Sequence, residues 1–285
     1  MTLELNAVRR DDFITLAGAA GHSVTVAPER GALVTSLNIA GRELLYMDEA
    51  TLFDANKNVR GGNPVLFPAP GKLTDDAWRQ AGKSGVMKQH GFARNLPWKA
   101  TVCGTQAVEL ELCANEVTLA HYPWRFRTQL RLTWIGTRLR VTTVVCNEDQ
   151  TAMPYALGFH PYFAVADKAR ARIPTAATSV YNNVTKRRET FAGFDFAQPE
   201  VDLHLLDHGD SCFLDLHEGS GVELTASKDF SVWVVWTVSG KNYICVEPWT
   251  AAGNAMNSGE RLSRLAPGES RESWFEIGWR GGGAS

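Results

Sequence analysis

Three short runs of this chain place ionisable side chains among aromatic rings, a mixture that core packing alone does not require. They are Lys88-Gln89-His90-Gly91-Phe92-Ala93-Arg94, Gly158-Phe159-His160-Pro161-Tyr162-Phe163 and Cys245-Val246-Glu247-Pro248-Trp249-Thr250. A single histidine beside glycine and phenylalanine is more often a hydrogen-bonded structural residue than a catalyst. Three runs of this kind in one chain favour a shared site, and we expect the first run to form one wall of it.

The ionisable residues of these runs suit acid/base chemistry. If His90, His160 and Glu247 meet, a carboxylate and an imidazole on opposite sides of a small ligand can remove one proton and deliver another without a metal or a nucleophile. Sugars need that combination: a base takes the proton of the anomeric hydroxyl, an acid protonates the ring oxygen, and the opened ring recloses on its other face. Trp249 and other aromatic residues could carry the apolar face of a sugar, although aromatic residues in strands are more often core.

Two arginines could supply cations to the same site. Arg60 precedes Gly61 and Gly62, where the backbone can approach a ligand closely, and Arg94 closes the first run. Either guanidinium could bind hydroxyls, and both together could bind a phosphate. The alternatives are a surface ion pair for Arg60 and a bracing role beside His90 for Arg94.

A polar cluster of His204, Asp207, His208 and Asp210 raises the question of a metal. The H-E-x-x-H spacing on a helix is absent and the chain has no C-x-x-C pair, so we expect no metal and no other cofactor. A single sugar-binding Asp is the better interpretation of the cluster. Glycine-rich nucleotide-binding motifs are also absent, so a nucleotide is not expected.

Composition excludes several classes of partner. The 285 residues carry a formal net charge of -2, with a pI of about 6.4, so no basic field draws the chain to nucleic acid or to anionic membranes. No run of about eighteen apolar residues predicts a membrane span. We therefore expect a cytoplasmic protein that acts on a small molecule, as a monomer or homodimer. The five cysteines are widely spread, which favours reduced and mostly buried thiols.

The elements that must position these residues show a period of two, the pattern of strands. Apolar and polar residues alternate from Phe126 to Trp134 and again after Gly136, which predicts an antiparallel hairpin. Another hairpin is expected across residues 24–39. Residues 230–238 are apolar on both sides and predict a central strand, followed by a strand over 243–247 that carries Glu247 at its end.

Helical periodicity is scarce in this sequence. The best candidates, around residues 74–80 and 167–172, offer a turn or two at most. Two stretches, 56–89 and 174–210, have the character of long loops, which often carry function. Because no linker or internal repeat divides the chain, we expect one all-β domain over residues 1–280 and a flexible tail over residues 281–285.

On these residues the sequence resembles the aldose 1-epimerase (galactose mutarotase-like) family. The resemblance spans most of the chain through four ordered motifs: Arg60-Gly61-Gly62-Asn63-Pro64-Val65-Leu66-Phe67-Pro68, His90-Gly91-Phe92-Ala93-Arg94, Gly158-Phe159-His160-Pro161-Tyr162-Phe163 and Val246-Glu247-Pro248-Trp249. It implies a large antiparallel β-supersandwich with few short helices. It also implies that Glu247 is the general base, His160 the general acid and His90 a contact to the ring oxygen or a neighbouring hydroxyl, with Arg60 and Asp210 on sugar hydroxyls.

Two departures from the family pattern bear on the substrate. Ser211 follows Asp210 where the enzymes for free sugars have histidine, which leaves Asp207 as a rival, and the arginine-containing motifs look more like the branch that acts on hexose 6-phosphates. The main hypothesis is an aldose 1-epimerase that interconverts the anomers of an aldohexose, and the alternative is a hexose-6-phosphate 1-epimerase. A non-catalytic sugar-binding protein would not need both an acid and a base. A glycosidase or lyase would use Asp210 and Glu247 as its two carboxylates.

Overall fold

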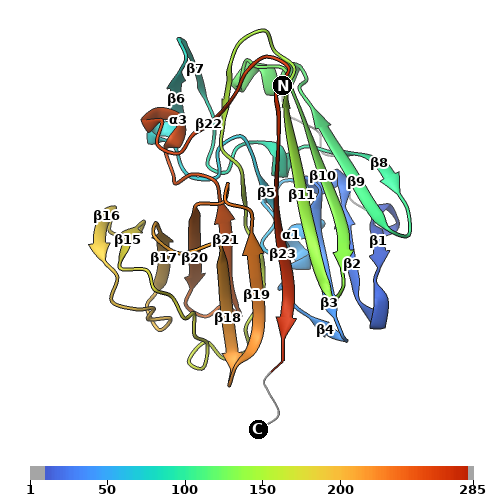
Figure 1. Ribbon diagram of the computed structural model, residues 1–285, viewed down its shortest axis with the longest axis vertical. Helices are drawn as coiled ribbons and strands as arrows, with labels where there is room; N and C mark the ends of the chain where they lie inside the picture. The colour runs from blue at the N-terminus through green and yellow to red at the C-terminus, as the bar shows by residue number, and fades with distance from the viewer. Residues whose placement is uncertain (1–9, 282–285) are drawn as a thin grey trace.

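The computed structural model describes residues 10–281 and consists mainly of antiparallel β-strands (Figure 1). Within that span the α-helices are short: α1 (Glu49–Leu52), α2 (Glu116–His121) and α3 (Ala255–Ser258). The 3-10 turns are η1 (Arg10–Asp12), η2 (Ala19–Gly21), η3 (Pro28–Arg30), η4 (Thr74–Asp76) and η5 (Ala93–Asn95). The predicted all-β class with few short helices is confirmed. Residues 282–285, nearly all of the expected tail, lie outside the described residues, as do residues 1–9.

A seven-stranded antiparallel sheet runs in the order β18-β19-β23-β11-β10-β9-β8. Its strands are β8 (Lys99–Cys103), β9 (Ala107–Cys113), β10 (Phe126–Ile135), β11 (Arg138–Asn147), β18 (Ser211–His217), β19 (Ser220–Ala226) and β23 (Ser270–Arg280). The hairpin predicted from the alternating pattern is confirmed as β10 and β11, which pair from Phe126 with Asn147 to Ile135 with Arg138. Figure 1 shows this hairpin in green, with the red β23 beside β11.

An eight-stranded sheet carries most of the residues singled out above. Its order is β16-β15-β17-β20-β21-β13-β5, and β14 also pairs with β21. The strands are β5 (Val65–Leu66), β13 (Gly158–Phe159), β14 (Tyr162–Ala164), β15 (Ser179–Asn182), β16 (Arg187–Thr190), β17 (Glu200–Leu205), β20 (Val232–Val238) and β21 (Tyr243–Trp249). The predicted central strand is therefore confirmed as β20, and the strand after it, β21, extends two residues beyond Glu247.

Three smaller sheets complete the fold. A four-stranded sheet in the order β1-β2-β3-β4 contains the other predicted hairpin, and two-stranded sheets pair β12 with β22 and β6 with β7. The strands are β1 (Ile14–Ala17), β2 (Ser23–Ala27), β3 (Leu33–Ile39), β4 (Arg42–Glu43), β6 (Ala77–Gln80), β7 (Lys83–Val86), β12 (Met153–Tyr155) and β22 (Ser263–Leu265).

Strand β21 is buried on both faces, and its two faces serve different purposes. Ile244 and Val246 join the main hydrophobic core, which also contains residues of the seven-stranded sheet such as Phe275. Because side chains alternate along a strand, the residues between and beside them point to the opposite face of the sheet. That second face carries Tyr243, Cys245, Glu247 and Trp249, all with 3% or less of their surface exposed.

Several local predictions were wrong. Residues 77–80 form β6 instead of continuing the turn η4, because they pair with β7. Residues 168–170 form a turn and Arg172 forms an isolated bridge with Asp215, so no helix forms over 167–172. The expected loop 174–210 contains β15, β16 and β17, whose exposed polar residues hide the alternating pattern. The cysteines are free, but only Cys212 and Cys245 are buried, whereas Cys103 and Cys113 are exposed.

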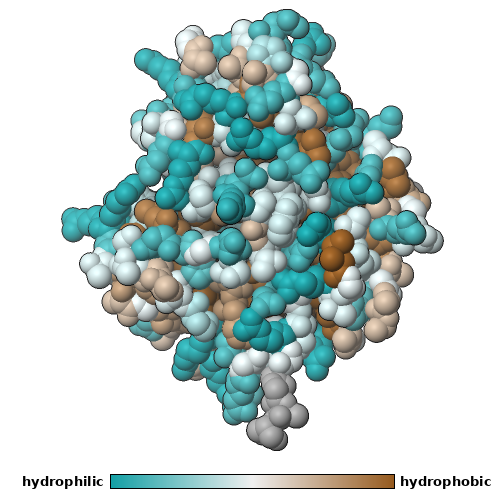
Figure 2. Space-filling view, viewed as in Figure 1, coloured by the Kyte–Doolittle hydropathy of each residue, from teal (hydrophilic) through white to brown (hydrophobic). Residues whose placement is uncertain are grey.

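Hydrophobic side chains are scattered singly over the face shown in Figure 2, among hydrophilic ones. The exposed large hydrophobic residues are likewise spread over different elements: Val86, Val102, Ile135 and Val184. Within residues 10–281, no helix has the length and apolar character needed to cross a membrane.

Candidate active site

The structure brings His160 and Glu247 into direct contact. Nε2 of His160 lies 3.3 Å from Oε1 of Glu247, and the two side chains are 7% and 1% exposed. His160 follows β13, and Glu247 lies within β21, the strand that pairs with β13 at Gly158 and Trp249. The second oxygen of Glu247, Oε2, accepts a 3.0 Å hydrogen bond from the indole N–H of Trp249. The carboxylate therefore has one fixed oxygen and one that faces the imidazole.

His90 completes a cluster of rings around this pair. Its ring centroid lies 5.5 Å from that of His160 and 6.3 Å from that of Trp249, with the planes nearly perpendicular in both cases. Nδ1 of His90 lies 2.5 Å from the carbonyl oxygen of Pro70. Because a carbonyl can only accept, Nδ1 carries the proton, and in the neutral ring Nε2 is an acceptor.

The turn that presents His90 depends on Gly91. His90 has φ of 74° and Gly91 has φ of 70°, so both occupy the left-handed region. A Cβ on Gly91 would lie 2.1 Å from the carbonyl oxygen of Phe67, which accepts hydrogen bonds from the backbone N–H groups of Phe92 and Ala93. Only glycine fits there, which explains the His-Gly-Phe order of the motif.

Burial sets the protonation of the cluster. It raises the pKa of Glu247 well above the usual value, and the charge of Asp202 adds to this rise, while the Trp249 hydrogen bond and Arg94 oppose it. Burial, together with His90 and Arg94, lowers the pKa of His160 well below the usual value. Burial and the charge of Arg94 lower the pKa of His90 to about 3. The site therefore disfavours a second proton on the paired histidine and keeps His90 neutral.

The two arginines approach the cluster from different loops. Arg94 lies in η5, is partly buried, and its charge acts on both histidines and on Glu247. Arg60 is exposed, and its guanidinium carbon lies 6.0 Å from the ring centroid of Trp236, whose ring is 5.6 Å from that of His160.

Asp202 is the site carboxylate that sequence reasoning missed. It lies on β17 opposite Trp236 of β20, which places it on the same face of the sheet as Glu247. Its Oδ1 lies 3.3 Å from Nε2 of His204, and its Oδ2 accepts a 2.6 Å hydrogen bond from Asn183. The alternation of Asp202 and His204 on a strand was the available signal.

Asp210 and Asp207 occupy other positions. Asp210 is exposed just before β18, and its backbone carbonyl accepts a hydrogen bond from the N–H of Ala226 in the seven-stranded sheet. The adjacent carbonyl of Gly209 accepts one from the indole N–H of Trp233, a residue of the main core. Asp207 is exposed and bonds to Thr178. No described contact joins either carboxylate to Glu247, because after β17 the chain passes from the eight-stranded sheet to β18 of the seven-stranded sheet.

A hollow of about 260 Å³ adjoins the aromatic side of the cluster. It is lined by Tyr46, Asp48, Arg60, Trp236, Val238, Lys241 and Tyr243. Trp236 also contacts His160, so the hollow and the acid/base pair share a wall. The combination of aromatic faces, two cations and a carboxylate suits a polar molecule with apolar faces.

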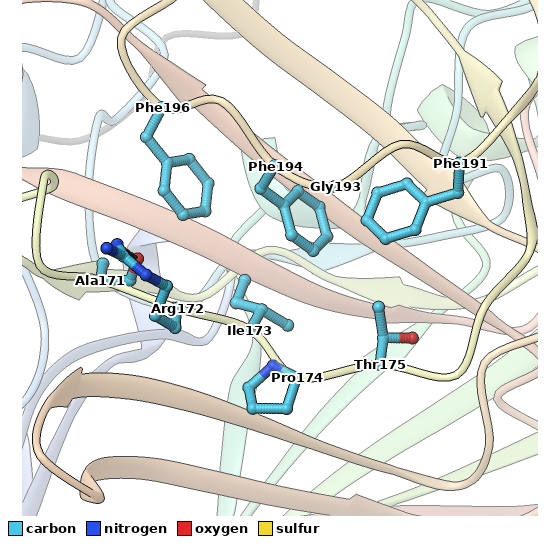
Figure 3. A pocket seen from close by; sticks show the side chains of 9 residues that line it. All are labelled: Ala171, Arg172, Ile173, Pro174, Thr175, Phe191, Gly193, Phe194 and Phe196. Carbon is cyan, nitrogen blue, oxygen red and sulfur yellow. Dashed lines mark hydrogen bonds between the residues drawn. The ribbon is translucent and has the colours of Figure 1, made fainter.

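A larger hollow of about 420 Å³ lies elsewhere, between residues 171–175 and the loop after β16 (Figure 3). Figure 3 shows Phe191, Phe194 and Phe196 along one wall, facing the segment that contains Ile173 and Pro174. Arg172 is its charged residue, and its Nη1 donates to the carbonyls of Ala169 and Ala171. This hollow contains no acid/base pair.

The described residues include one group with the donors for a metal. His160, Cys245 and Glu247 each offer a ligand atom, and these atoms lie within 4.8 Å of one another.

The fold and the histidine–glutamate pair agree with the comparisons to known proteins. The family model for aldose 1-epimerase matches residues 12–278, and the chain belongs to that family. It is therefore an isomerase of the epimerase type, with a sugar or sugar phosphate as its substrate.

Individual relatives agree with this assignment. The chain is 26% identical to a Cenchrus ciliaris protein named "Putative glucose-6-phosphate 1-epimerase", over 94% of this chain and 82% of the relative. It is similar to the Slr1438 protein from Synechocystis, with 33% identity, a TM-score of 0.91, and 98% and 99% of the two chains covered. A galactose mutarotase related enzyme from Lactobacillus acidophilus shares the fold, with a TM-score of 0.78 at 19% identity, over 96% and 99% of the two chains.

Proposed function

We propose that this protein interconverts the α and β anomers of an aldohexose by acid/base-catalysed ring opening. The observation that supports the proposal is the 3.3 Å approach of Nε2 of His160 to Oε1 of Glu247 on a buried face of the sheet. A carboxylate beside an imidazole supplies the acceptor and the donor that ring opening requires.

The reaction needs two proton transfers and no net change of protons. Glu247 removes the proton of the anomeric hydroxyl as the bond between C1 and the ring oxygen breaks, and His160 delivers a proton to that oxygen. The product of this step is the open-chain aldehyde. Rotation about the C1–C2 bond exposes the other face of the aldehyde, and the reverse transfers close the ring as the other anomer and restore both residues.

The pKa shifts fit a pair that holds one proton. Burial raises the pKa of Glu247 and lowers that of His160, so both shifts favour the pair in which Glu247 carries the proton and His160 is neutral. The ionised and neutral forms of the one-proton pair differ only by transfer across the 3.3 Å contact. Each turnover begins and ends with that proton count.

His90, Arg94 and Asp202 would orient the sugar. The neutral Nε2 of His90 accepts a hydrogen bond from a hydroxyl, whereas it has no proton to offer the ring oxygen. Arg94 donates to hydroxyls, and Asp202 accepts from them. Trp249 is 3% exposed, so its part is to hold the Glu247 carboxylate and not to provide an open platform.

Polarimetry of a freshly dissolved α-aldohexose tests the proposal. The wild-type protein should accelerate the approach to anomeric equilibrium, and Glu247→Gln should lower kcat about 10²–10⁴-fold, the usual contribution of a general base. The exposed Asp210→Asn variant is the control and should retain the wild-type rate. If neither free nor phosphorylated aldoses respond to the wild-type protein, the proposal is wrong.

A hexose 6-phosphate is the second candidate substrate. It is favoured by the two cations, Arg60 and Lys241, that line the hollow beside Trp236. Phosphate binds well to arginine and lysine because both keep their charge at neutral pH. Asp48 also lines this hollow, but its carboxylate caps α1 by accepting from the backbone N–H of Ala50.

The ratio of kcat/KM for phosphorylated and free aldohexose separates the two candidates. If phosphate binds in the hollow, Arg60→Gln and Lys241→Gln should each lower that ratio about tenfold, because a charge-assisted hydrogen bond contributes about 1.5–3 kcal/mol. Lys228→Gln, a substitution of an exposed lysine away from the hollow, is the matched control. Equal ratios in all four proteins would leave the free sugar as the substrate.

A further inference from the structure

Glu247 and His160 share their face of the sheet with a third donor that the proposed reaction does not use. Cys245 lies two residues before Glu247 on β21, and both side chains point away from the main core. The three residues are almost completely buried: taken with their backbones, Cys245 is 0%, Glu247 1% and His160 6% exposed. Their sulfur, oxygen and nitrogen donors all lie within 4.8 Å of one another.

The spacing of these donors is close to that of a zinc site. Zinc binds sulfur at about 2.3 Å and nitrogen or oxygen at about 2.0–2.2 Å, so two donors on one tetrahedral ion lie roughly 3.4–3.6 Å apart. The contact of His160 Nε2 with Glu247 Oε1, at 3.3 Å, already has that separation. The thiol needs to close by about 1.2–1.4 Å at most, because its distance to either partner is 4.8 Å or less.

We propose that His160, Cys245 and Glu247 form an inhibitory site for a thiophilic divalent cation of the zinc type. A cysteine, a histidine and a carboxylate are all zinc ligands, and three protein ligands leave a fourth position for water. The inhibitory part rests on the proposed function, since the cation occupies the nitrogen and the oxygen that ring opening requires. The ion and the sugar therefore exclude each other.

Cys245 makes the site selective. Thiolate and imidazole ligands favour zinc, cobalt and cadmium, whereas magnesium and calcium require six or more oxygen ligands that these residues do not supply. Without Cys245 the set is reduced to one imidazole and one carboxylate, which is a weak site for any of these ions. Because of the Cys245 thiol, the occupancy of the sugar site would depend on the concentration of free zinc.

Cobalt absorption tests the site without reference to catalysis. Cys103 and Cys113 are exposed and Cys146 is partly exposed, so these thiols could bind metal at the surface. Cys113 and Cys146 also lie on the two strands that flank β10, each opposite Arg127, which places them on one face of the sheet. The background protein is therefore Cys103→Ser/Cys113→Ser/Cys146→Ser. On addition of Co²⁺ it should show a thiolate-to-cobalt charge-transfer band and tetrahedral d–d bands in a 1:1 complex, and Zn²⁺ should displace the cobalt. Absence of these bands would overturn the proposal, even if the protein is an active epimerase.

Inhibition then tests the competition. In the same background, Zn²⁺ should inhibit competitively with respect to the sugar, and Mg²⁺ at the same concentration should not inhibit. Adding Cys245→Ser should raise the inhibition constant for Zn²⁺ about tenfold or more, whatever the variant's own rate. An unchanged inhibition constant in Cys245→Ser, or inhibition that sugar does not relieve, would contradict the assignment.

Discussion

The indole N–H of Trp249 donates a 3.0 Å hydrogen bond to Oε2 of Glu247, two residues earlier on the same strand. Burial raises the pKa of Glu247, and this hydrogen bond opposes the rise because it stabilises the charged carboxylate. The ring therefore tunes the proposed base as well as orienting it.

Trp249→Phe keeps an apolar ring and removes the donor. The pKa of Glu247 should rise further, so the limb of the kcat/KM profile that reports the carboxylate should move to higher pH, and activity at neutral pH should fall about tenfold. The profile is measured with an aldohexose across the stable pH range. Trp274→Phe, on β23, is the control. A profile that does not move in Trp249→Phe would show that the hydrogen bond does not tune the base.

Glu247→Gln should stabilise the fold at neutral pH although it lowers kcat. The pKa of Glu247 is raised above 4.5 in the folded state, so its burial has no electrostatic cost below pH 4.5, and stability is lost as the pH rises towards the folded pKa. Gln stays neutral throughout. The free energy of unfolding in urea, measured at about pH 4.5 and about pH 8, should therefore favour the variant increasingly at the higher pH. A constant difference between the two proteins would contradict the raised pKa.

His90→Gln should reduce the sensitivity of the fold to acid. The pKa of His90 falls from 6.5 to about 3 on folding, so the unfolded chain takes up a proton that the folded protein refuses as the pH drops through this window. Between pH 6.5 and about 4.5 this linkage costs the wild type about 2–3 kcal/mol of stability. Urea unfolding at the two pH values should show a smaller loss in the variant. His121→Gln, on the surface helix α2, is the comparison and should behave as the wild type does.

Asp202→Asn and Asp210→Asn separate the two candidate sugar-binding carboxylates. Asp202 shares the face of Glu247, so its substitution should lower kcat/KM about tenfold or more through the loss of a charge-assisted hydrogen bond to the sugar. Asp210 lies outside the cluster, and its substitution should leave kcat/KM within about twofold. The opposite pattern would restore Asp210 as the sugar-binding residue.

Gly91→Ala should destabilise the protein more than Gly41→Ala. Both glycines have positive φ, at 70° and 81°, and alanine in that region costs about 1–2 kcal/mol. At Gly91 the new Cβ would also lie 2.1 Å from a backbone oxygen, whereas nothing lies within 4 Å of it at Gly41. Chemical denaturation of both variants measures the difference. Equal losses of stability would mean that the turn beside His90 adjusts freely.

The sequence predicts the long strands well and the short ones poorly, for a physical reason. Strands β10 and β11 have one buried face and one polar face, so their alternation is visible, and the apolar run of β20 marks a central strand. Strands β15 to β17 lie towards the sheet edge and carry exposed polar residues, so the pattern of this stretch is typical of a loop.

Local sequence patterns predict the site only in part, as they do the strands. The sequence runs that contain His90, His160 and Glu247 stand out because they mix ionisable and aromatic residues, and the structure brings them together. Asp202 has no aromatic residue beside it, and its alternation with His204 does not say which face of which sheet it occupies; the pairing of β17 with β20 places it on the face of Glu247. That pairing is a relation between distant segments, which local patterns do not reveal.

Strand β21 holds a core residue and a proposed catalyst side by side in the chain, Val246 and Glu247. A slip of this strand by one residue would turn the carboxylate inward and present valine to the sugar, while also burying a charge in the core. The loops that carry Arg60 and Lys241 can vary the cations of the hollow beside Trp236 without disturbing this alternation. The register of β21, in contrast, is kept or lost for all of its residues together.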